Sequence, residues 1–320
     1  MAVAATEIDI EPKPLVGIAL KIVSVAIFVI MSALIKAAGM VPAGQIVFFR
    51  SFFAIFPILV MLVWQRELAT AFRTRHPVGH VMRGLVGVAS MGLGFFGLTR
   101  LPLPDAVTLN YAQPLLVVVF SAIFMGEIVR IYRWSAVVIG FAGVVIIAWP
   151  NLTLLAGNGA ELGAEQALGV IATLLGAAAS AVAMLLVRRL VLTEKTSTIV
   201  LWFSVTATVV SLLTIPFGWA WLTAWQFLAL AAAGICGGIA QVLMTQCYRH
   251  AELSTIAPFE YTSMLLAIMV GYFAFGDIPT LYTLVGGLIV VGAGLFIIWR
   301  ERQLGLKRVA ARRFVRPGQG

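Results

Sequence analysis

The sequence contains ten long apolar runs, and these runs constrain the fold more than any other feature. They cover residues 15–36, 42–64, 81–99, 104–125, 132–149, 168–187, 198–218, 225–247, 254–275 and 280–299. A helix needs about 20 apolar residues to cross a hydrocarbon core about 30 Å thick. Only helices and closed barrels can span lipid, and these runs lack the alternation of barrel strands. We therefore predict an all-α integral membrane protein with ten transmembrane helices.

The composition agrees with this prediction and argues against other classes. Of the 320 residues, 61% are hydrophobic and 11% are charged, whereas a soluble domain carries about 25% charged residues. A net charge of +9 could indicate nucleic-acid binding. However, the basic residues lie in short loops and a C-terminal tail, and the sequence contains no nucleic-acid-binding motif. The two cysteines, Cys236 and Cys247, lie in one apolar run and indicate neither a disulfide framework nor zinc. We predict no nucleic-acid partner, no metal and no cofactor.

The distribution of Lys and Arg predicts the orientation in the membrane. If alternate segments are assigned to one side, starting with the N-terminus, the opposite side holds only Lys36 and Arg100, and its long loop 150–167 has no basic residue. The positive-inside rule then places both termini in the cytoplasm. The N-terminus also lacks the basic region of a cleaved signal peptide. These features predict a multi-pass protein of the cytoplasmic (inner) membrane.

This topology divides the chain into five parts. We predict a cytoplasmic N-terminal segment (1–14), a first half (15–149), an extracytoplasmic loop (150–167), a second half (168–299) and a basic cytoplasmic tail (300–320). The tail "RERQLGLKRVAARRFVR" suits either a position near anionic lipid headgroups or a solvated segment.

The two halves repeat each other with a shift of 150 residues. The most informative matches are aromatic residues, glycines and acids: Tyr111 with Tyr261, Gly126 with Gly276, Glu127 with Asp277, Tyr132 with Tyr282, and Trp149 with Trp299. Five spans per half is an odd number, so the second half is expected to be inverted relative to the first. Inverted repeats are a recurrent plan of secondary transporters, whose substrate site lies between the halves near the middle of the membrane.

The stretch "LPLPDAVTLNYAQPLLVVVFSAIFMGE", followed by "GFAGVVIIAW", resembles the EamA-type halves of the drug/metabolite transporter superfamily. The matching features are Pro114 within a helix, the helix end at Gly126, and glycines in the next helix. The second half departs from the pattern where Met264 stands opposite Pro114 and where Asp277 replaces the usual Glu. The resemblance covers roughly residues 15–300 and implies ten helices, two inverted halves and transport without ATP.

Residues 101–127 are most similar to importers of riboflavin or S-adenosylmethionine. Riboflavin uptake is the favoured hypothesis, because candidate aromatic side chains could stack on a flat ring: Tyr111, Trp202, Tyr248 and Tyr261. The alternatives are import or export of amino acids, S-adenosylmethionine or other metabolites. The sequence leaves the direction, the coupling ion and a homodimer open.

Polar residues inside the fourth and ninth runs are the main site candidates. Asn110 and Gln113 lie three residues apart and share a helix face, and the repeat places Glu260 and Ser263 on the equivalent face. Polar groups rarely face lipid, so these residues are expected to surround a central cavity for a small-molecule substrate, together with the repeat-related tyrosines 111 and 261. The alternative is that they bond neighbouring helices to one another.

Charged residues inside the spans are further candidates. Arg50 could hold an anionic or carbonyl-rich substrate, or it could be a structural arginine. Glu260 is the only carboxylate well inside a span, which makes it the candidate for ion coupling. Lys21 lies at a similar depth and could pair with it, or could extend to the interface. Trp202 and Gln241 are weaker candidates for substrate contact, with ordinary packing as the alternative.

A membrane-embedded enzyme is the alternative from a different class. Such enzymes need a nucleophile with its base, paired acids or a metal cluster. The three histidines, His76, His80 and His250, lie in or beside predicted loops, and the sequence has no HExxH or aspartate-rich motif. We therefore predict no catalytic residues.

Overall fold

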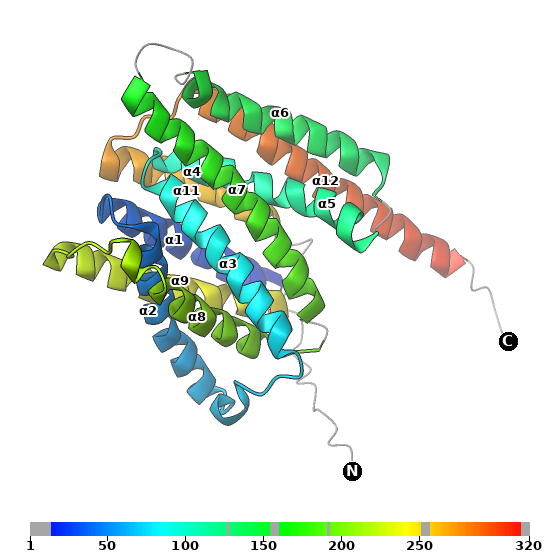
Figure 1. Cartoon of the computed structure of the whole chain (residues 1–320). Coiled ribbons are helices and arrows are strands. Elements are labelled where there is room, and N and C mark those ends of the chain that lie inside the picture. Colours follow the sequence, from blue (N-terminus) through cyan, green and yellow to red (C-terminus); the bar gives the residue numbers. More distant parts are fainter. Residues whose placement is uncertain (1–13, 127–128, 154–159, 191–192, 251–256, 315–320) are drawn as a thin grey trace.

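The computed structural model describes residues 14–126, 129–153, 160–190, 193–250 and 257–314. Over these ranges the chain forms helices and turns, without a strand. The α-helices are α1 (Pro14–Ala37), α2 (Ala43–Trp64), α3 (Pro77–Leu98), α4 (Leu103–Asn110), α5 (Ala112–Met125), α6 (Ile131–Thr153), α7 (Ala160–Leu190), α8 (Thr196–Leu212), α9 (Ala224–His250), α11 (Thr262–Val270) and α12 (Leu281–Phe314). Figure 1 shows them as one elongated bundle. The all-α fold predicted from the sequence is confirmed.

The lengths of the helices suit a bilayer. In the described part of the chain, eight helices are long and apolar enough to span a membrane, and two shorter apolar segments, Ser197–Leu212 and Phe259–Phe275, accompany them. Each of the ten predicted runs overlaps one of these segments.

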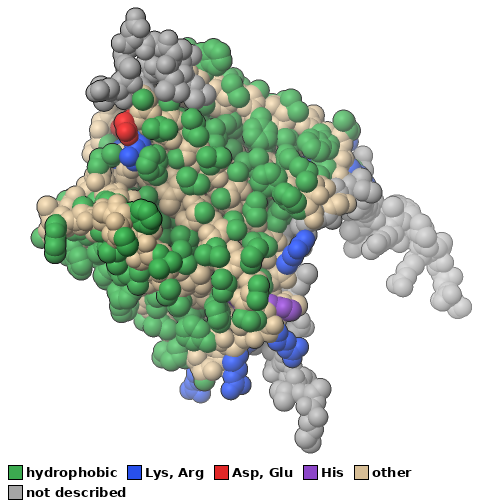
Figure 2. Space-filling model, in the orientation of Figure 1, with side chains coloured by type: hydrophobic (Ala, Val, Ile, Leu, Met, Phe, Trp, Pro, Cys, Tyr) green, Lys and Arg blue, Asp and Glu red, His purple; other side chains and the backbone are tan. Residues whose placement is uncertain are grey.

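Large apolar side chains cover the outside of the bundle. Trp64, Phe217, Trp221 and Phe273 are each at least 80% exposed, which would be a liability in water. Figure 2 shows hydrophobic side chains over most of the visible face, while Lys and Arg gather at its lower edge, where α2 ends and α3 begins. A lipid environment accounts for this surface.

Two helices are longer than their apolar runs. α7 begins at Ala160, inside the segment predicted as a loop, because "AELGAEQ" consists mostly of residues that favour helix. α12 continues to Phe314 through most of the predicted tail. In contrast, α8 ends at Leu212, shortly before Pro216, which cannot donate a backbone hydrogen bond.

The fourth run is broken into α4 and α5 at Tyr111. Pro114 explains the position of the break, since a proline cannot bond the carbonyl four residues earlier, here that of Asn110, and its ring clashes with that group. The ninth segment begins similarly, with a 3₁₀ turn at Ala257–Tyr261 that precedes α11. Both irregular segments occur where polar residues interrupt apolar runs.

Gly126 and Gly276, which the repeat aligns, have the same backbone conformation. Gly126 ends α5 with φ of 64°, and Gly276 ends the π-helical turn Gly271–Phe275 with φ of 67°. Only glycine adopts this left-handed conformation at little cost. The predicted helix end in the first half therefore has a structural equivalent in the second.

Helix packing follows the same repeat, which maps α1 onto α7 and α9 onto α3. α1 packs on α9, and α7 packs on α3. The first pair is antiparallel: Ser24 Oγ donates to the Ala240 carbonyl over 2.8 Å, and Gln226 Nε2 donates to the Ala38 carbonyl over 3.0 Å. The second pair is also antiparallel, with Ser90 beside Gly176 and the end of α3 beside the start of α7.

The directions of the remaining helices show that the halves are inverted. α2 is antiparallel to α8, since Glu67 bonds Lys195 while Gln45 bonds Ala220. Contacts at glycines place α9 parallel to α2. α8 runs parallel to α3, because Arg75, just before α3, bonds Glu194, just before α8, and Gly84 lies against Thr206 further along. Because the α1–α9 and α3–α7 pairs are antiparallel, α1 and its repeat partner α7 run in opposite directions.

Candidate functional site

A cavity of about 740 Å³ lies at the centre of the bundle. Its lining comes from both halves, chiefly from α1, α3, α4, α5, α7 and α12. The volume lies within the range of about 300–1,000 Å³ typical of small-molecule sites. Eleven residues were singled out in the sequence, and ten of them have described side chains. Nine of these ten line the cavity: Lys21, Arg50, Asn110, Tyr111, Gln113, Gln241, Glu260, Tyr261 and Ser263.

Trp202 is the exception, and its predicted place at the site is not what the structure shows. Its ring stacks on His80 with centroids 5.6 Å apart, and its Nε1 donates to the Phe72 carbonyl over 3.4 Å. The side chain therefore packs on the start of α3, away from the cavity. The side chain of Tyr248 lies outside the described residues.

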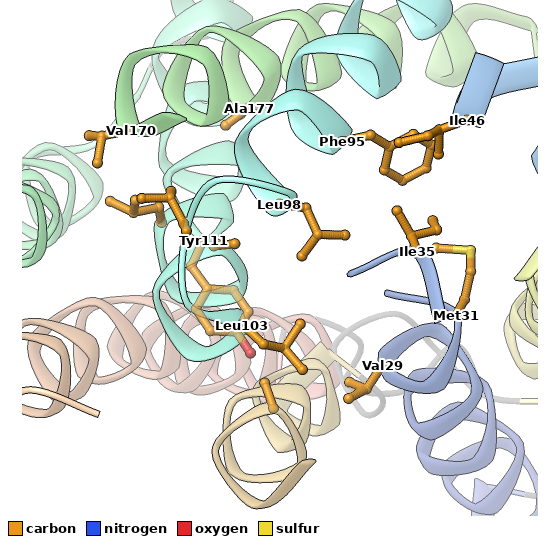
Figure 3. Packing of buried hydrophobic residues seen from close by; sticks show 14 of the residues in the cluster. Val29, Met31, Ile35, Ile46, Phe95, Leu98, Leu103, Tyr111, Val170 and Ala177 are labelled. Atoms are coloured by element: carbon orange, nitrogen blue, oxygen red, sulfur yellow. The ribbon is translucent and has the colours of Figure 1, made fainter. Parts of the chain in front are cut away.

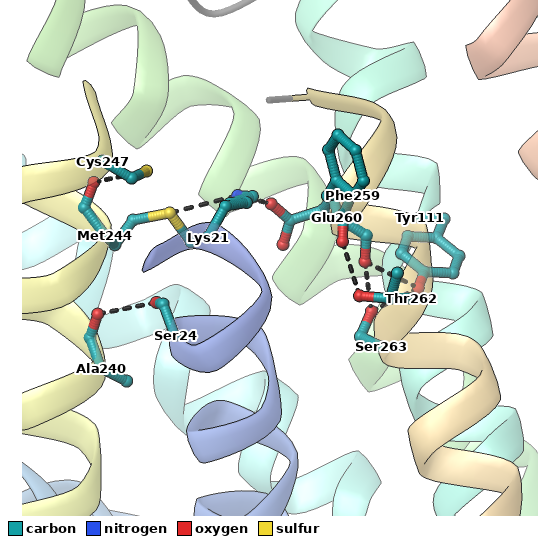
Figure 4. Close-up of polar contacts among 10 residues, drawn as sticks. All are labelled: Lys21, Ser24, Tyr111, Ala240, Met244, Cys247, Phe259, Glu260, Thr262 and Ser263. Carbon is teal, nitrogen blue, oxygen red and sulfur yellow. Dashed lines mark hydrogen bonds and ion pairs between the residues drawn. The ribbon is translucent and has the colours of Figure 1, made fainter. Parts of the chain in front are cut away.

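An ion pair joins the two halves at the end of the bundle where α1 begins, which we name the Lys21 end. Lys21 Nζ pairs with the Glu260 carboxylate and also lies 3.1 Å from the sulfur of Met244 (Figure 4). The Lys21 side chain is only 3% exposed, whereas that of Glu260 is 44% exposed. The lysine is therefore held inside the protein rather than extended to the interface.

The repeat-related tyrosines meet at the middle of the site. Tyr111 and Tyr261 contact each other edge to face, with ring centroids 5.2 Å apart. The Tyr111 hydroxyl hydrogen-bonds Ser263, whose hydroxyl in turn donates to the Glu260 carbonyl over 2.7 Å (Figure 4). This network connects the break between α4 and α5 to the irregular start of α11.

The opposite end, where α1 stops, is closed, and we name it the Lys36 end. Lys36 Nζ lies 2.8 Å from Asp277 Oδ2 and donates to the Leu101 carbonyl over 2.8 Å, while the Leu103 amide donates to Asp277 over 2.9 Å. The side chains of Ile35, Leu101 and Leu103 are at most 2% exposed. Figure 3 shows Ile35 and Leu103 within the packed core near this end. A substrate-sized molecule therefore cannot enter the cavity from this end.

Some cavity residues were not singled out as site candidates from the sequence. Ser90, Thr173 and Ser180 contribute hydroxyl groups, and Met184 and Met244 contribute sulfur atoms. The hydroxyl residues occur among glycines and alanines, a pattern that indicates close helix packing. Thr173 has two roles: it packs against Gly97, and it lines the cavity.

An all-helical bundle with a polar cavity between two inverted halves, closed at one end by ion pairs, defines a membrane transport protein. The comparisons with known proteins identify which kind. The EamA-like transporter family matches the chain twice, over residues 15–149 and 167–299. The chain belongs to this family and is a multi-pass inner-membrane protein whose substrate is a small molecule.

Similar proteins of known name differ in what they carry. The chain is 24% identical to an S-adenosylmethionine uptake transporter of Rickettsia bellii, covering 83% of this chain and 87% of that protein. It is 28% identical to a pseudopaline exporter of Pseudomonas aeruginosa, covering 87% and 94%. It is also 28% identical to a riboflavin transporter of Rhizobium johnstonii, covering 77% and 78%. A solved crystal structure matches with a TM-score of 0.63 at 21% identity, covering 90% and 98%, which supports the fold alone.

Proposed function

We propose that this protein is a secondary transporter that moves a small organic metabolite across the inner membrane by alternating access. The observation that carries the proposal is the cavity of about 740 Å³, lined by polar and charged residues of two inverted halves. Rocking of such halves exposes a fixed central site to each side in turn. Saturable transport, rather than channel-like flow, is expected.

In this proposal ten spans place both termini in the cytoplasm, so the Lys21 end faces the cytoplasm and the Lys36 end faces outward. The cavity lining reaches Lys21, Met184 and Met244 towards the Lys21 end, while Lys36 and Asp277 help close the other end. The structure therefore corresponds to the cytoplasm-facing state. The basic continuation of α12 is proposed to contact anionic headgroups.

The proposed substrate-binding groups are the candidates from the sequence that line the cavity, except Lys21. Arg50, Asn110, Tyr111, Gln113, Gln241, Glu260, Tyr261 and Ser263 make up this set. Glu260 is also the proposed coupling group, because protonation would break its ion pair with Lys21, which joins the two halves. Trp202 is not part of the site.

Riboflavin uptake is the first specific proposal for the substrate. It is supported by the sequence around residues 101–127, by the similarity to a riboflavin transporter, and by the tyrosines and amides of the cavity. S-adenosylmethionine or an amino acid is the second proposal. It is supported by the charges in the lining, Arg50, Lys21 and Glu260, which suit a zwitterion better than an uncharged ring.

Reconstitution of the purified protein in liposomes tests the proposed function. Exchange of labelled riboflavin, S-adenosylmethionine, aromatic amino acids and organic acids should show saturable, competable uptake of at least one compound. The double variant Asn110→Ala with Gln113→Ala should lower that uptake, whereas Ser135→Ala, on the exposed side of α6, should not. Uptake equal to that of protein-free liposomes for the whole panel would overturn the proposal.

A further inference from the structure

We propose that Arg50 binds a carboxylate of the substrate, with the Phe203 ring beside its guanidinium and the charge of Arg83 adding to the attraction for the anion. The inference rests on the proposed transport function and favours the second substrate proposal, a metabolite with a carboxylate, over uncharged riboflavin. Arg50 comes from α2, Arg83 from α3 and Phe203 from α8, so three helices converge at this point.

Arg50 is buried, faces the cavity and makes no ion pair among the described residues. It is 7% exposed and lines the cavity wall. Its Nε is buried without a hydrogen-bond acceptor, and the ion pairs of the described chain involve other residues. A buried cation without a partner is costly. An anionic ligand in the adjacent cavity would supply the missing partner.

The Phe203 ring lies close to the guanidinium groups of both Arg50 and Arg83. The Cζ atom of Arg83 lies 3.7 Å from the centre of the Phe203 ring, and that of Arg50 lies 6.0 Å from the same ring. A ring face attracts cations at such distances. Nε and Nη1 of Arg83 are also buried without acceptors in the described structure, so a second positive charge adds to the attraction for an anion.

Glycines leave room for both guanidinium groups. A Cβ at Gly237 would approach Arg50 Nε to 3.2 Å, and a Cβ at Gly87 would approach Arg83 Nη1 to 3.2 Å. Both distances are tighter than ordinary contacts. The guanidinium groups therefore lie against backbone surfaces, which restricts their orientation without using their hydrogen-bond donors.

The chemistry of the cavity identifies the ligand as a carboxylate. Among the described residues of the lining, the other basic residue is Lys21, which is already paired with Glu260. Arg50 is therefore the residue available to the substrate. A guanidinium presents a planar fork of donors that matches the two oxygens of a carboxylate. Polar hydroxyls and amides elsewhere in the cavity suit the uncharged parts of the molecule.

The test compares matched compounds that differ only in a carboxylate. The probes are S-adenosylmethionine with its decarboxylated analogue, phenylalanine with phenethylamine, and uncharged riboflavin. Transport into liposomes and thermal unfolding of the purified full-length protein are measured for the wild type, Arg50→Gln, Arg83→Gln and the control Arg73→Gln, which changes an exposed loop residue.

In the wild type, the carboxylate member of at least one pair should bind about tenfold or more tightly than its partner, as expected for charge-assisted hydrogen bonds. Arg50→Gln should abolish this difference, Arg83→Gln should reduce it, and Arg73→Gln should leave it unchanged. Ligand-free Arg50→Gln should also melt at the same or a higher temperature, because an unpaired buried charge is removed.

Three results would overturn the inference. The first is a wild type that transports riboflavin but no carboxylate, in which case the transport function stands and the carboxylate site fails. The second is unchanged discrimination in Arg50→Gln. The third is a clearly lower melting temperature of ligand-free Arg50→Gln, as for an arginine with a structural role. If no probe is transported or bound, the inference fails, and uptake of organic acids, the remaining compounds of the panel above, decides whether the transport function fails with it.

Discussion

The seal at the Lys36 end makes a quantitative prediction for Asp277→Asn, a change that keeps the shape of the side chain and removes its charge. Asp277 accepts hydrogen bonds from Lys36 and from the Leu103 amide at 2.8 and 2.9 Å. Both side chains of the ion pair are at most 17% exposed. In the proposed mechanism these bonds exist only while the outer end is closed, so their loss acts on one state alone.

The size of the effect follows from the two bonds. Hydrogen bonds to a charged group contribute about 1.5–3 kcal/mol each, so weakening two of them by about half removes roughly 1.5–3 kcal/mol from the closed state. Since 1.4 kcal/mol is about a factor of ten, the outward-open population should rise by about 10- to 100-fold.

Labelling of a cysteine introduced at Leu101 measures this population. In a variant without Cys236 and Cys247, a membrane-impermeant maleimide added from outside should react about 10- to 100-fold faster when Asp277→Asn is present. Glu165→Gln is the matched control: it breaks the nearby Arg100 pair, in which Glu165 is 55% exposed, and exposed pairs contribute at most about 1 kcal/mol. Equal labelling of the two variants would refute the reasoning.

Three further predictions concern other parts of the molecule. Glu260→Gln should abolish pH-dependent accumulation of the transported compound in liposomes while exchange continues; pH dependence that survives would exclude Glu260 as the coupling group. Gly286→Leu should lower the melting temperature of the purified protein, because even a Cβ there would come within 2.6 Å of the Gly143 carbonyl on α6. Overpacking of this kind costs about 1–3 kcal/mol. An unchanged melting temperature would show that α6 and α12 do not cross so closely. Glu194, whose carboxylate binds the Arg75 amide over 2.8 Å, has a pKa below its ordinary value of 4.5, because hydrogen bonds to Thr74 and Arg75 outweigh the opposing effect of burial. This hydrogen bond is therefore fully formed above pH 4.5 and is lost as the pH falls through the lowered pKa. Hydrogen exchange of the Arg75 amide should be slow at pH 7, and Glu194→Gln should accelerate it. Equal exchange in the two proteins would contradict the assignment.

The sequence predicted the helices well because their main determinant is the length of apolar runs. It also related Tyr111 to Tyr261 through the repeat, and the two rings are in contact. Depth along a helix can be counted in residues. The sequence therefore predicts that Lys21 and Glu260 lie at a similar depth in the membrane, and the two side chains form an ion pair. Repeat symmetry and depth therefore account for most of the predicted candidates that line the cavity.

The direction in which a side chain points around its helix was harder to predict, because it depends on which helices are neighbours. Trp202 has the depth and chemistry of a site residue, but it turns towards His80. Arg83 was not singled out from the sequence, and its position beside Phe203 depends on the contact between α3 and α8. Neither contact has a periodic signature in a single sequence.

The lysines that join the halves are not repeated, although the fold is. Both lysines belong to α1, and the positions that match them 150 residues later are apolar, Ile171 and Leu186. The pair at the Lys36 end is largely buried and has additional backbone bonds, whereas Glu260 at the Lys21 end is 44% exposed and its pair is screened by water. Opening the Lys36 end therefore breaks largely buried interactions, whereas the Lys21–Glu260 pair is already formed in a structure whose cavity reaches the Lys21 end. We expect the empty protein to rest in the cytoplasm-facing state, so that bound substrate or a proton on Glu260 must supply the free energy for outward opening.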